Sequence, residues 1–440
     1  MEKSLFQMIE DLVNEEGHIA WKYYPDWHFD LDVETLFSNS GAASFIKEYF
    51  SAGSKESPLY LEPLSYEFKH NNNSRDRESN ISNNQFSIDG LPNDKAVHTV
   101  SAFFLGILIE YAVFGNNHLT ASVNGDDGFT FPYLWFLTSL YHDFGYQFEQ
   151  NNEYYNRIKQ CLAENDCYSQ HACTTSHALE TVFRSLDISF GSAQRFRSNN
   201  QDISHAHALY TELLAYAKDT IHHPIRYSNG AVIRNGWYKN NIIPKYFDYR
   251  FWDMTVCDHG IIGGSLFLDR IIKNYATTYL RECNRQRRIL NLENFYERNS
   301  GLHSSKQQLP VFSHISDCII AHNVYKASAD KEAMYRFYGL ESLIGNRFTR
   351  VSANRDPLLY ILSITDTIDP IKAYKNVSAY TPVEILKNLS FEFEPGDKAI
   401  TVSATDALSI EPIYKSANSL NEWTAATVEN RTERSFTLLL

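Results

Sequence analysis

The sequence predicts a mainly α-helical protein, and three observations support that class. Apolar residues recur at helical spacing in several separated segments, the first of them over residues 97–111. Strand-like alternation is confined to the region after Pro382, and no repeat of fixed period is visible. The 440 residues leave room for two or three domains and a sizeable core.

The N-terminal region, residues 1–90, combines a helix with a polar loop. Residues 1–11 form an amphipathic acidic opening, unlike the basic start and apolar core of a signal peptide. Residues 70–80 lead into further Asn and Ser, a composition typical of a mobile loop. We therefore expect the helical domain to begin after this loop.

The second region, residues 91–375, is predicted to be a helical domain with a long insertion. The insertion, about 150–255, is expected to form a lid or subdomain, with helices around 154–164, 175–186 and 205–219. The periodicity outside it predicts helices around 97–111, 132–147, 260–274, 315–327 and 356–368.

The third region, residues 376–440, is predicted to be a small α+β appendage. Segments 389–394 and 399–403 alternate like strands on either side of the turn Pro395-Gly396-Asp397. A helix near 413–425 and a last strand near 434–439 follow.

Charge and composition disfavour several classes of protein. A net charge of −13 gives no overall field to attract nucleic acid, so general nucleic-acid binding is not expected. The longest apolar run, residues 102–109, is far shorter than a membrane span, so no membrane association is expected. Six cysteines at unrelated spacings favour reduced thiols in a cytoplasmic protein. The oligomeric state is left open.

One group of cysteines could suggest a zinc knot. Zinc sites usually use tighter ligand pairs than this group offers, which makes the interpretation the weaker one. Its members are Cys161, Cys167, Cys173, His171 and His177.

The most informative motif is His142-Asp143, which follows an apolar helical run and precedes Gly145. An imidazole and an adjacent carboxylate can bind one cation from the same helix end, while the second carboxylate oxygen is free to bridge to another metal. Further ligand-type residues lie in separate apolar segments: His98, His259, His322 and Asp366.

This ordered set resembles the His…His-Asp…His…His…Asp pattern of the HD-domain superfamily of metal-dependent phosphohydrolases. The resemblance covers five blocks between about residues 94 and 374. It implies an HD-domain helical bundle in which His98, His142, Asp143 and Asp366 hold one metal ion. His259 and His322 would then join the bridging Asp143 on a second ion.

In this interpretation Asp143 and His142 are the catalytic residues, and the cofactors are two divalent metal ions. Imidazole and carboxylate ligands suit Mn, Fe, Ni, Zn or Mg. The resemblance implies hydrolysis of a small-molecule phosphate ester, such as a nucleotide or cyclic nucleotide, by a metal-activated water. Two alternatives stay open: a di-iron oxygenase resembling inositol oxygenase, and a non-catalytic nucleotide-binding regulatory module.

The chain departs from the cyclic-dinucleotide phosphodiesterases of the HD-GYP branch. Tyr146 stands where their Lys follows the His-Asp-x-Gly motif, Asn323 replaces their second tandem histidine, and their Gly-Tyr-Pro signature is absent. The substrate is therefore not specified by the motifs. Candidates for substrate contact are Lys95, Tyr146, Asn323 and Lys372. A solvated helix face is the favoured interpretation of the basic cluster Arg281, Arg285, Arg287 and Arg288.

Several assignments near these motifs have competitors. His314 competes with His322, and the Ala-His-Asn context favours His322. Asp94 is either an outer-shell or extra ligand, or the start of a helix. Three glycines near His259 would allow close helix approach: Gly260, Gly263 and Gly264. An aromatic stretch either stacks on a substrate base or, more simply, packs in the core: Trp237, Tyr238, Tyr246, Phe247, Tyr249, Phe251 and Trp252.

Overall fold

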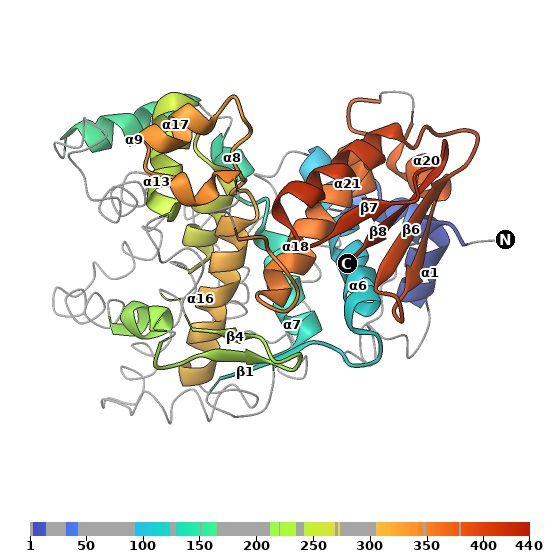
Figure 1. Cartoon of the computed structure of the whole chain (residues 1–440), viewed down its shortest axis with the longest axis horizontal. Helices are drawn as coiled ribbons and strands as arrows, with labels where there is room; N and C mark the ends of the chain where they lie inside the picture. The colour runs from blue at the N-terminus through green and yellow to red at the C-terminus, as the bar shows by residue number, and fades with distance from the viewer. Residues whose placement is uncertain are drawn as a thin grey trace, which may run out of the picture.

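The structure is a computed structural model of the chain, and its helices are arranged around a central group of four (Figure 1). The structure describes residues 3–14, 32–42, 93–123, 129–149, 152–164, 212–219, 221–234, 242–268, 272, 305–345, 349–377 and 380–440. The loop predicted over residues 70–80 lies outside these ranges.

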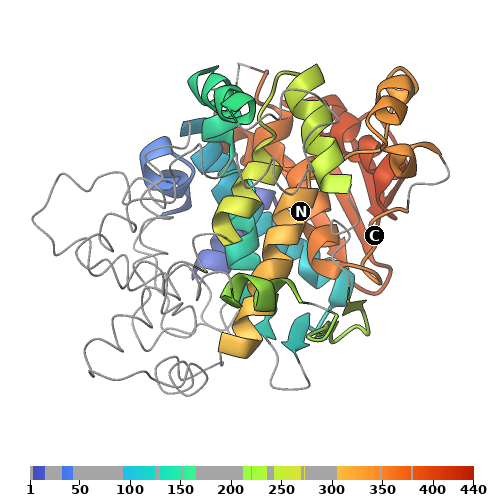
Figure 2. The same cartoon turned by 90° about the vertical axis from the view of Figure 1, so that its left-hand side faces the viewer.

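The central helices are α6 (Asn93–Phe114), α7 (Phe131–Tyr141), α16 (Ser305–Ala321) and α18 (Pro357–Ile368). α6 packs against α7 and α18, and α16 packs against α7 and α18. Figure 2 shows α16 running through the middle of the molecule. The mainly α-helical class is confirmed.

α6 is apolar on nearly all of its faces because neighbouring elements surround it. Its segment Lys95–Phe114 is long and apolar enough to cross a membrane, yet 89% of its most apolar stretch is buried inside the molecule. A core helix of a soluble protein has this property. Cytoplasmic location stays a prediction.

Two of the predicted helices have wrong boundaries. α7 ends at Tyr141 rather than continuing to residue 147, and a turn through Gly145 leads into the short helix α8 (Tyr146–Glu149). α16 begins ten residues before the predicted start and ends at Ala321 instead of residue 327. Its internal Pro310, a residue that usually ends helices, hides the first turns in the sequence pattern.

The helix His259–Leu268 begins at the predicted position. Asp258 precedes it, and its carboxylate accepts a hydrogen bond from the Ile261 amide at 3.0 Å, which satisfies a free N–H of the first turn. Close approach to α16 requires glycine at position 264, because a Cβ there would lie 2.6 Å from the Ser316 carbonyl oxygen. The predicted reason for the glycines near His259 is therefore correct at this position.

A small antiparallel sheet links the predicted insertion to the segment after α6. Its order is β2 (Phe129–Thr130), β1 (Thr120–Val123), β3 (Ile225–Tyr227) and β4 (Val232–Ile233). This sheet was not predicted, because strands this short carry no clear alternation in the sequence. In the insertion, α9 (Asn152–Glu164) and helical residues 212–218 agree with the prediction, whereas the helix predicted at 175–186 lies outside the described residues.

The aromatic stretch of the insertion forms part of the core. α13 (Ile242–Asp248) and the π-helix η4 (Tyr249–Asp253) bury Tyr246, Phe247, Tyr249 and Phe251, each at most 3% exposed. The Tyr249 ring contacts Tyr335 in α17 (Glu332–Phe337), which is followed by the short helix η5 (Glu341–Leu343). The core-packing alternative is the one the structure supports for these four rings, and Trp237 and Tyr238 lie outside the described residues.

The C-terminal region contains a second antiparallel sheet, ordered β5 (Leu389–Glu394), β6 (Ala399–Ala404), β8 (Ser435–Leu439) and β7 (Thr427–Glu429). Three of these strands and the helix α21 (Glu411–Trp423) occur where the sequence predicts them, and β7 was missed. The shorter helices of this half are α19 (Pro370–Ala373) and α20 (Pro382–Lys387).

This C-terminal unit packs on the helical core and on the start of the chain. α21 lies against α18, and α1 (Leu5–Asn14), beside α2 (Val33–Leu36), packs on α20 and β5 (Figure 1). A bridge between Ser4 and Ser390 joins the two segments directly. The buried residues form one continuous hydrophobic core that extends into both regions.

Candidate metal centre

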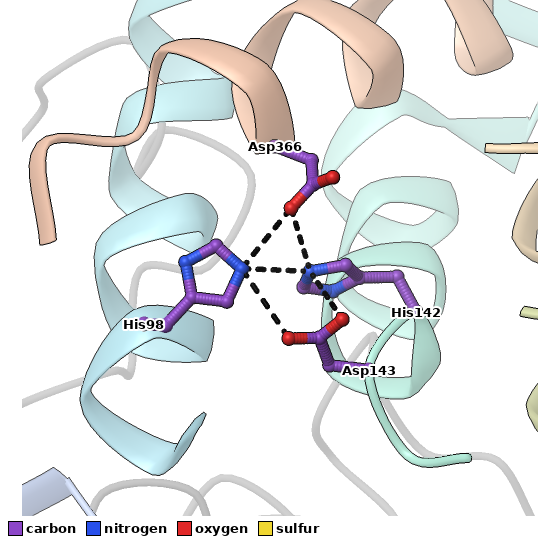
Figure 3. Close-up of side chains that lie close together, drawn as sticks. All are labelled: His98, His142, Asp143 and Asp366. Atoms are coloured by element: carbon purple, nitrogen blue, oxygen red, sulfur yellow. Dashed lines mark hydrogen bonds and ion pairs between the residues drawn. The ribbon is translucent and has the colours of Figure 1, made fainter. Parts of the chain in front are cut away.

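Four side chains of ligand type meet between three of the central helices. His98 comes from α6, His142 and Asp143 follow the last turn of α7, and Asp366 comes from the end of α18. One ligand atom from each lies within 4.8 Å of the others, and all four residues are buried. His98 Nε2 lies 3.2 Å from both His142 Nε2 and Asp366 Oδ1, as Figure 3 shows.

A second group shares Asp143 with the first. His259, at the start of its helix, and His322, just beyond α16, each place a ligand atom within 4.8 Å of Asp143. Asp143 Oδ1 lies 3.6 Å from His259 Nε2, and its Oδ2 lies 3.4 Å from His98 Nε2. The carboxylate therefore faces both groups, as a bridging ligand would.

In each of the four histidines, Nδ1 lies at hydrogen-bond distance from an acceptor oxygen. Nδ1 of His98 lies 2.7 Å from Asp369 Oδ2, and Nδ1 of His259 lies 2.9 Å from Glu149 Oε2. For His142 and His322 the acceptors are backbone carbonyls, of Ser139 at 2.6 Å and Ile319 at 2.5 Å. A proton on Nδ1 leaves the Nε2 lone pair free to face the centre, which is how metal-binding histidines are oriented.

Two buried atoms at the centre fit this interpretation. His322 Nε2 and Asp143 Oδ1 have no hydrogen-bond partner among the described residues. A buried polar atom without a partner costs about 1–3 kcal/mol, so native structures rarely keep one without a function. The donor set of imidazoles and carboxylates suits a divalent metal ion.

Burial and neighbouring charges give the histidines different protonation behaviour. Burial lowers the pKa of His98, but the charges of nearby carboxylates, above all Asp369, outweigh it and raise the pKa to about 9. Burial, and then the positive charge of His259, lower the pKa of His322 to about 3. His322 is consequently neutral at pH 7, which is the form that binds metal.

The two carboxylates stay ionised despite their burial. Burial raises the pKa of Asp143, but the positive charges of His142, His98 and Lys95 hold it well below the usual range of a carboxyl. Burial acts in the same direction on Asp366, and the Lys372 ammonium does most to keep its pKa low. Both side chains can therefore act as anionic ligands at neutral pH.

An outer layer of polar residues orients the ligands, and the sequence analysis did not identify it. Ser101 Oγ donates to Asp369 at 2.6 Å. Arg250 donates to Glu149 at 2.9 Å and lies 3.1 Å from Asp258. A search for acidic residues near the ligands in sequence could have suggested Asp258 and Asp369, but the ion pair of Arg250 with Glu149 has no such signal.

The predicted substrate residues lie in different places. Lys95 Nζ donates to Asp143 Oδ2 at 3.0 Å and lies 3.5 Å from the centre of the Tyr146 ring. The Tyr146 ring in turn stacks on His259, with ring centroids 3.7 Å apart. Lys372 Nζ donates to Asp366, at 2.6 Å to Oδ1. These three residues adjoin the metal ligands.

The remaining candidates do not adjoin the centre or cannot be placed. Asn323 donates to Asp258 at 2.6 Å and thus supports the layer behind His259. His314 belongs to a separate cluster with Cys318 and Asp356, whereas His322 lies with Asp143 and His259. The side chains of Asp94, of the four-arginine cluster and of the zinc-knot residues lie outside those that the structure describes.

A cavity of about 340 Å³ lies beside Asp366 and Lys372. This volume is within the range of small-molecule pockets, about 300–1,000 Å³. Its lining comes from the residues after α16, from the end of α18 and the residues after it, and from α21. The lining residues are Tyr325, Lys326, Asp366, Thr367, Lys372, Ser416, Ser419, Glu422 and Trp423.

Comparison with protein-family models, curated proteins and solved structures found no match to this chain. The assignment of a site therefore depends on the geometry. The buried cluster of His98, His142, Asp143 and Asp366 could bind a metal ion, and its arrangement is compatible with an HD-type site.

Proposed function

We propose that the protein is an HD-type, metal-dependent phosphohydrolase that acts on a small phosphate ester, such as a nucleotide or cyclic nucleotide. One observation carries this proposal. Four histidine Nε2 atoms converge on two buried carboxylates, and each histidine is fixed at Nδ1 by its own acceptor. The order of these ligands along the chain is the order of the HD-domain pattern.

His98, His142, Asp143 and Asp366 would hold one divalent ion, and Asp143, His259 and His322 would hold the second. Bound metal supplies Lewis acidity and lowers the pKa of water near neutrality. The protein contributes rigid positions, because the ligands come from buried helices or their ends. Asp143 would keep the two ions together, and the outer carboxylates Asp369 and Glu149 would hold His98 and His259 in the required tautomer.

Two lysines favour a phosphate ester as the substrate. A phosphate group carries negative charge, and it needs cationic or hydrogen-bonding partners beyond the ions themselves. The ammonium groups of Lys95 and Lys372 already lie at Asp143 and Asp366, where each can also donate to a substrate oxygen. The adjoining cavity has the size of a small-molecule pocket and supports a nucleotide over a polynucleotide.

The test begins with protein purified without chelator. Its metal content is measured by mass spectrometry, and phosphate release is then screened over nucleoside phosphates, cyclic nucleotides and cyclic dinucleotides. We expect two divalent ions at the candidate metal centre of each chain and phosphate release that stops with Asp366→Ala. Bound iron with substrate-dependent oxygen consumption would identify the oxygenase alternative. Tight nucleotide binding without turnover in the metal-loaded protein would identify the regulatory one.

A further inference from the structure

We propose that the protein holds an additional metal ion, of the zinc class, at a site separate from the candidate metal centre. The ligands are His314 and Cys318 of α16 and Asp356 at the start of α18. The hydroxyl of Tyr227 on β3 lies beside them. This proposal does not depend on the phosphohydrolase assignment, because none of these four residues belongs to that centre.

The spacing of the three ligand atoms matches a metal site. His314 Nε2 lies 3.7 Å from both Cys318 Sγ and Asp356 Oδ1, and Sγ lies 3.8 Å from Oδ1. An almost equilateral triangle with these edges has a centre about 2.2 Å from each corner, and zinc lies about 2.0–2.3 Å from such ligands.

The residue types and their placement agree with the same assignment. His314 and Cys318 are four residues apart on one helix, so both side chains project from the same face. Their side chains are buried, and the side chain of Asp356 is 14% exposed. A thiolate, an imidazole and a carboxylate together suit zinc far better than calcium or magnesium.

A fourth oxygen is already present at the edge of the cluster. The Tyr227 hydroxyl lies 2.6 Å from His314 Nε2, and Tyr227 itself is 4% exposed. A bound ion would thus join α16 to α18, and Tyr227 places the small sheet against the cluster. The competing explanation is a metal-free polar network in which Tyr227 donates to His314.

Cobalt distinguishes these explanations, because a thiolate–cobalt bond gives an intense charge-transfer band in the near ultraviolet. The chelator-treated full-length chain is titrated with Co²⁺ and its absorption spectrum is recorded. The candidate metal centre contains only imidazole and carboxylate ligands and gives no such band. We expect the band in the wild type and its loss on addition of Zn²⁺, which replaces cobalt.

Two serine variants locate the thiolate. Cys318→Ser should abolish the band and lower zinc content by one ion per chain. Cys257→Ser, which changes a cysteine that is equally buried, should retain both the cobalt band and the zinc content of the wild type. A wild-type protein without the band, or a Cys318→Ser protein that keeps it, would overturn the proposal.

Three further measurements test the assignment independently. If Cys318→Ser does not fold, Asp356→Asn should shift the cobalt band, and an unchanged spectrum would contradict the assignment. A variant with serine in place of Cys161, Cys167 and Cys173 should keep the cobalt band. Loss of the band in this variant would show that the thiolate ligand comes from that segment instead of Cys318. Added Zn²⁺ should also raise the melting temperature of the chelator-treated chain carrying Asp143→Ala, in which the candidate metal centre lacks the ligand shared by its two groups.

Discussion

Asp143 is the residue on which both halves of the candidate metal centre depend. We predict that Asp143→Ala removes both metal ions of this centre and abolishes turnover, because its carboxylate lies close to histidines of both groups. His322→Ala serves as the comparison and should lose one ion only, since it belongs to the second group alone. Mass spectrometry measures the metal content of both variants, and circular dichroism verifies that they are folded. An Asp143→Ala protein that holds as many ions as the wild type would refute the bridging role.

Asp369 is predicted to act through His98. Asp369→Asn should lower metal affinity about 10–100-fold, the usual effect of removing an acceptor behind a metal-binding histidine. Ser101→Ala is the matched control, because it removes a donor to Asp369 but leaves the Asp369–His98 contact in place. Its effect should be clearly smaller. Competition with a chromophoric chelator measures both affinities, and equal losses would contradict the positioning role.

The sequence could suggest the candidate ligands but not the residues that orient them. The six ligands follow an ordered pattern in which each residue lies in its own apolar segment. Asp369 is 271 residues away from His98, and no spacing rule connects them. The Glu149–Arg250 pair likewise forms only when the predicted insertion folds back on the end of α7. Such contacts depend on tertiary structure, which a single sequence does not reveal.

At the scale of elements, Gly145 determines how the turn after α7 meets the next ligand helix. A Cβ at this position would lie 1.9 Å from the carbonyl oxygen of His259. We predict that Gly145→Ala displaces that helix, destabilises the fold by about 1–3 kcal/mol or more and weakens metal binding. Urea unfolding and metal content test this.

Gly396→Ala is the control for that substitution, because a Cβ there would meet nothing within 4 Å. It should change neither the unfolding midpoint nor the metal content appreciably. If Gly145→Ala were as well tolerated as Gly396→Ala, the contact between the turn and the His259 helix would not be a constraint on the centre.

The same turn explains why the end of α7 was predicted wrongly. Apolar residues continue beyond Tyr141, so their periodicity alone predicts a longer helix. The chain instead leaves the helix at His142, and Asp143 thereby faces both histidine groups. In contrast, α18 and the strands β5, β6 and β8 have boundaries that agree closely with the prediction, because capping residues, a turn and regular alternation mark them.

At the scale of the whole molecule, the candidate metal centre joins elements from α6 to α18. We predict that removing the metal lowers the melting temperature, because an ion that binds only the folded state stabilises it, by about 2.7 kcal/mol at a free concentration 100 times its Kd. Scanning calorimetry with and without chelator measures the shift. The Asp366→Ala variant should show a much smaller shift, and an equal one would assign the stabilisation to another site.

The cavity beside Asp366 has walls from three separate parts of the chain. Every candidate ligand lies between residues 98 and 366, whereas Ser416, Ser419 and Glu422 of α21 form the opposite wall. Substitutions in α21 can consequently alter which molecules enter without disturbing any ligand. In the proposed phosphohydrolase, catalysis would depend on the candidate ligands and substrate preference on α21. A new substrate preference could then evolve, or be engineered, through substitutions in α21 alone.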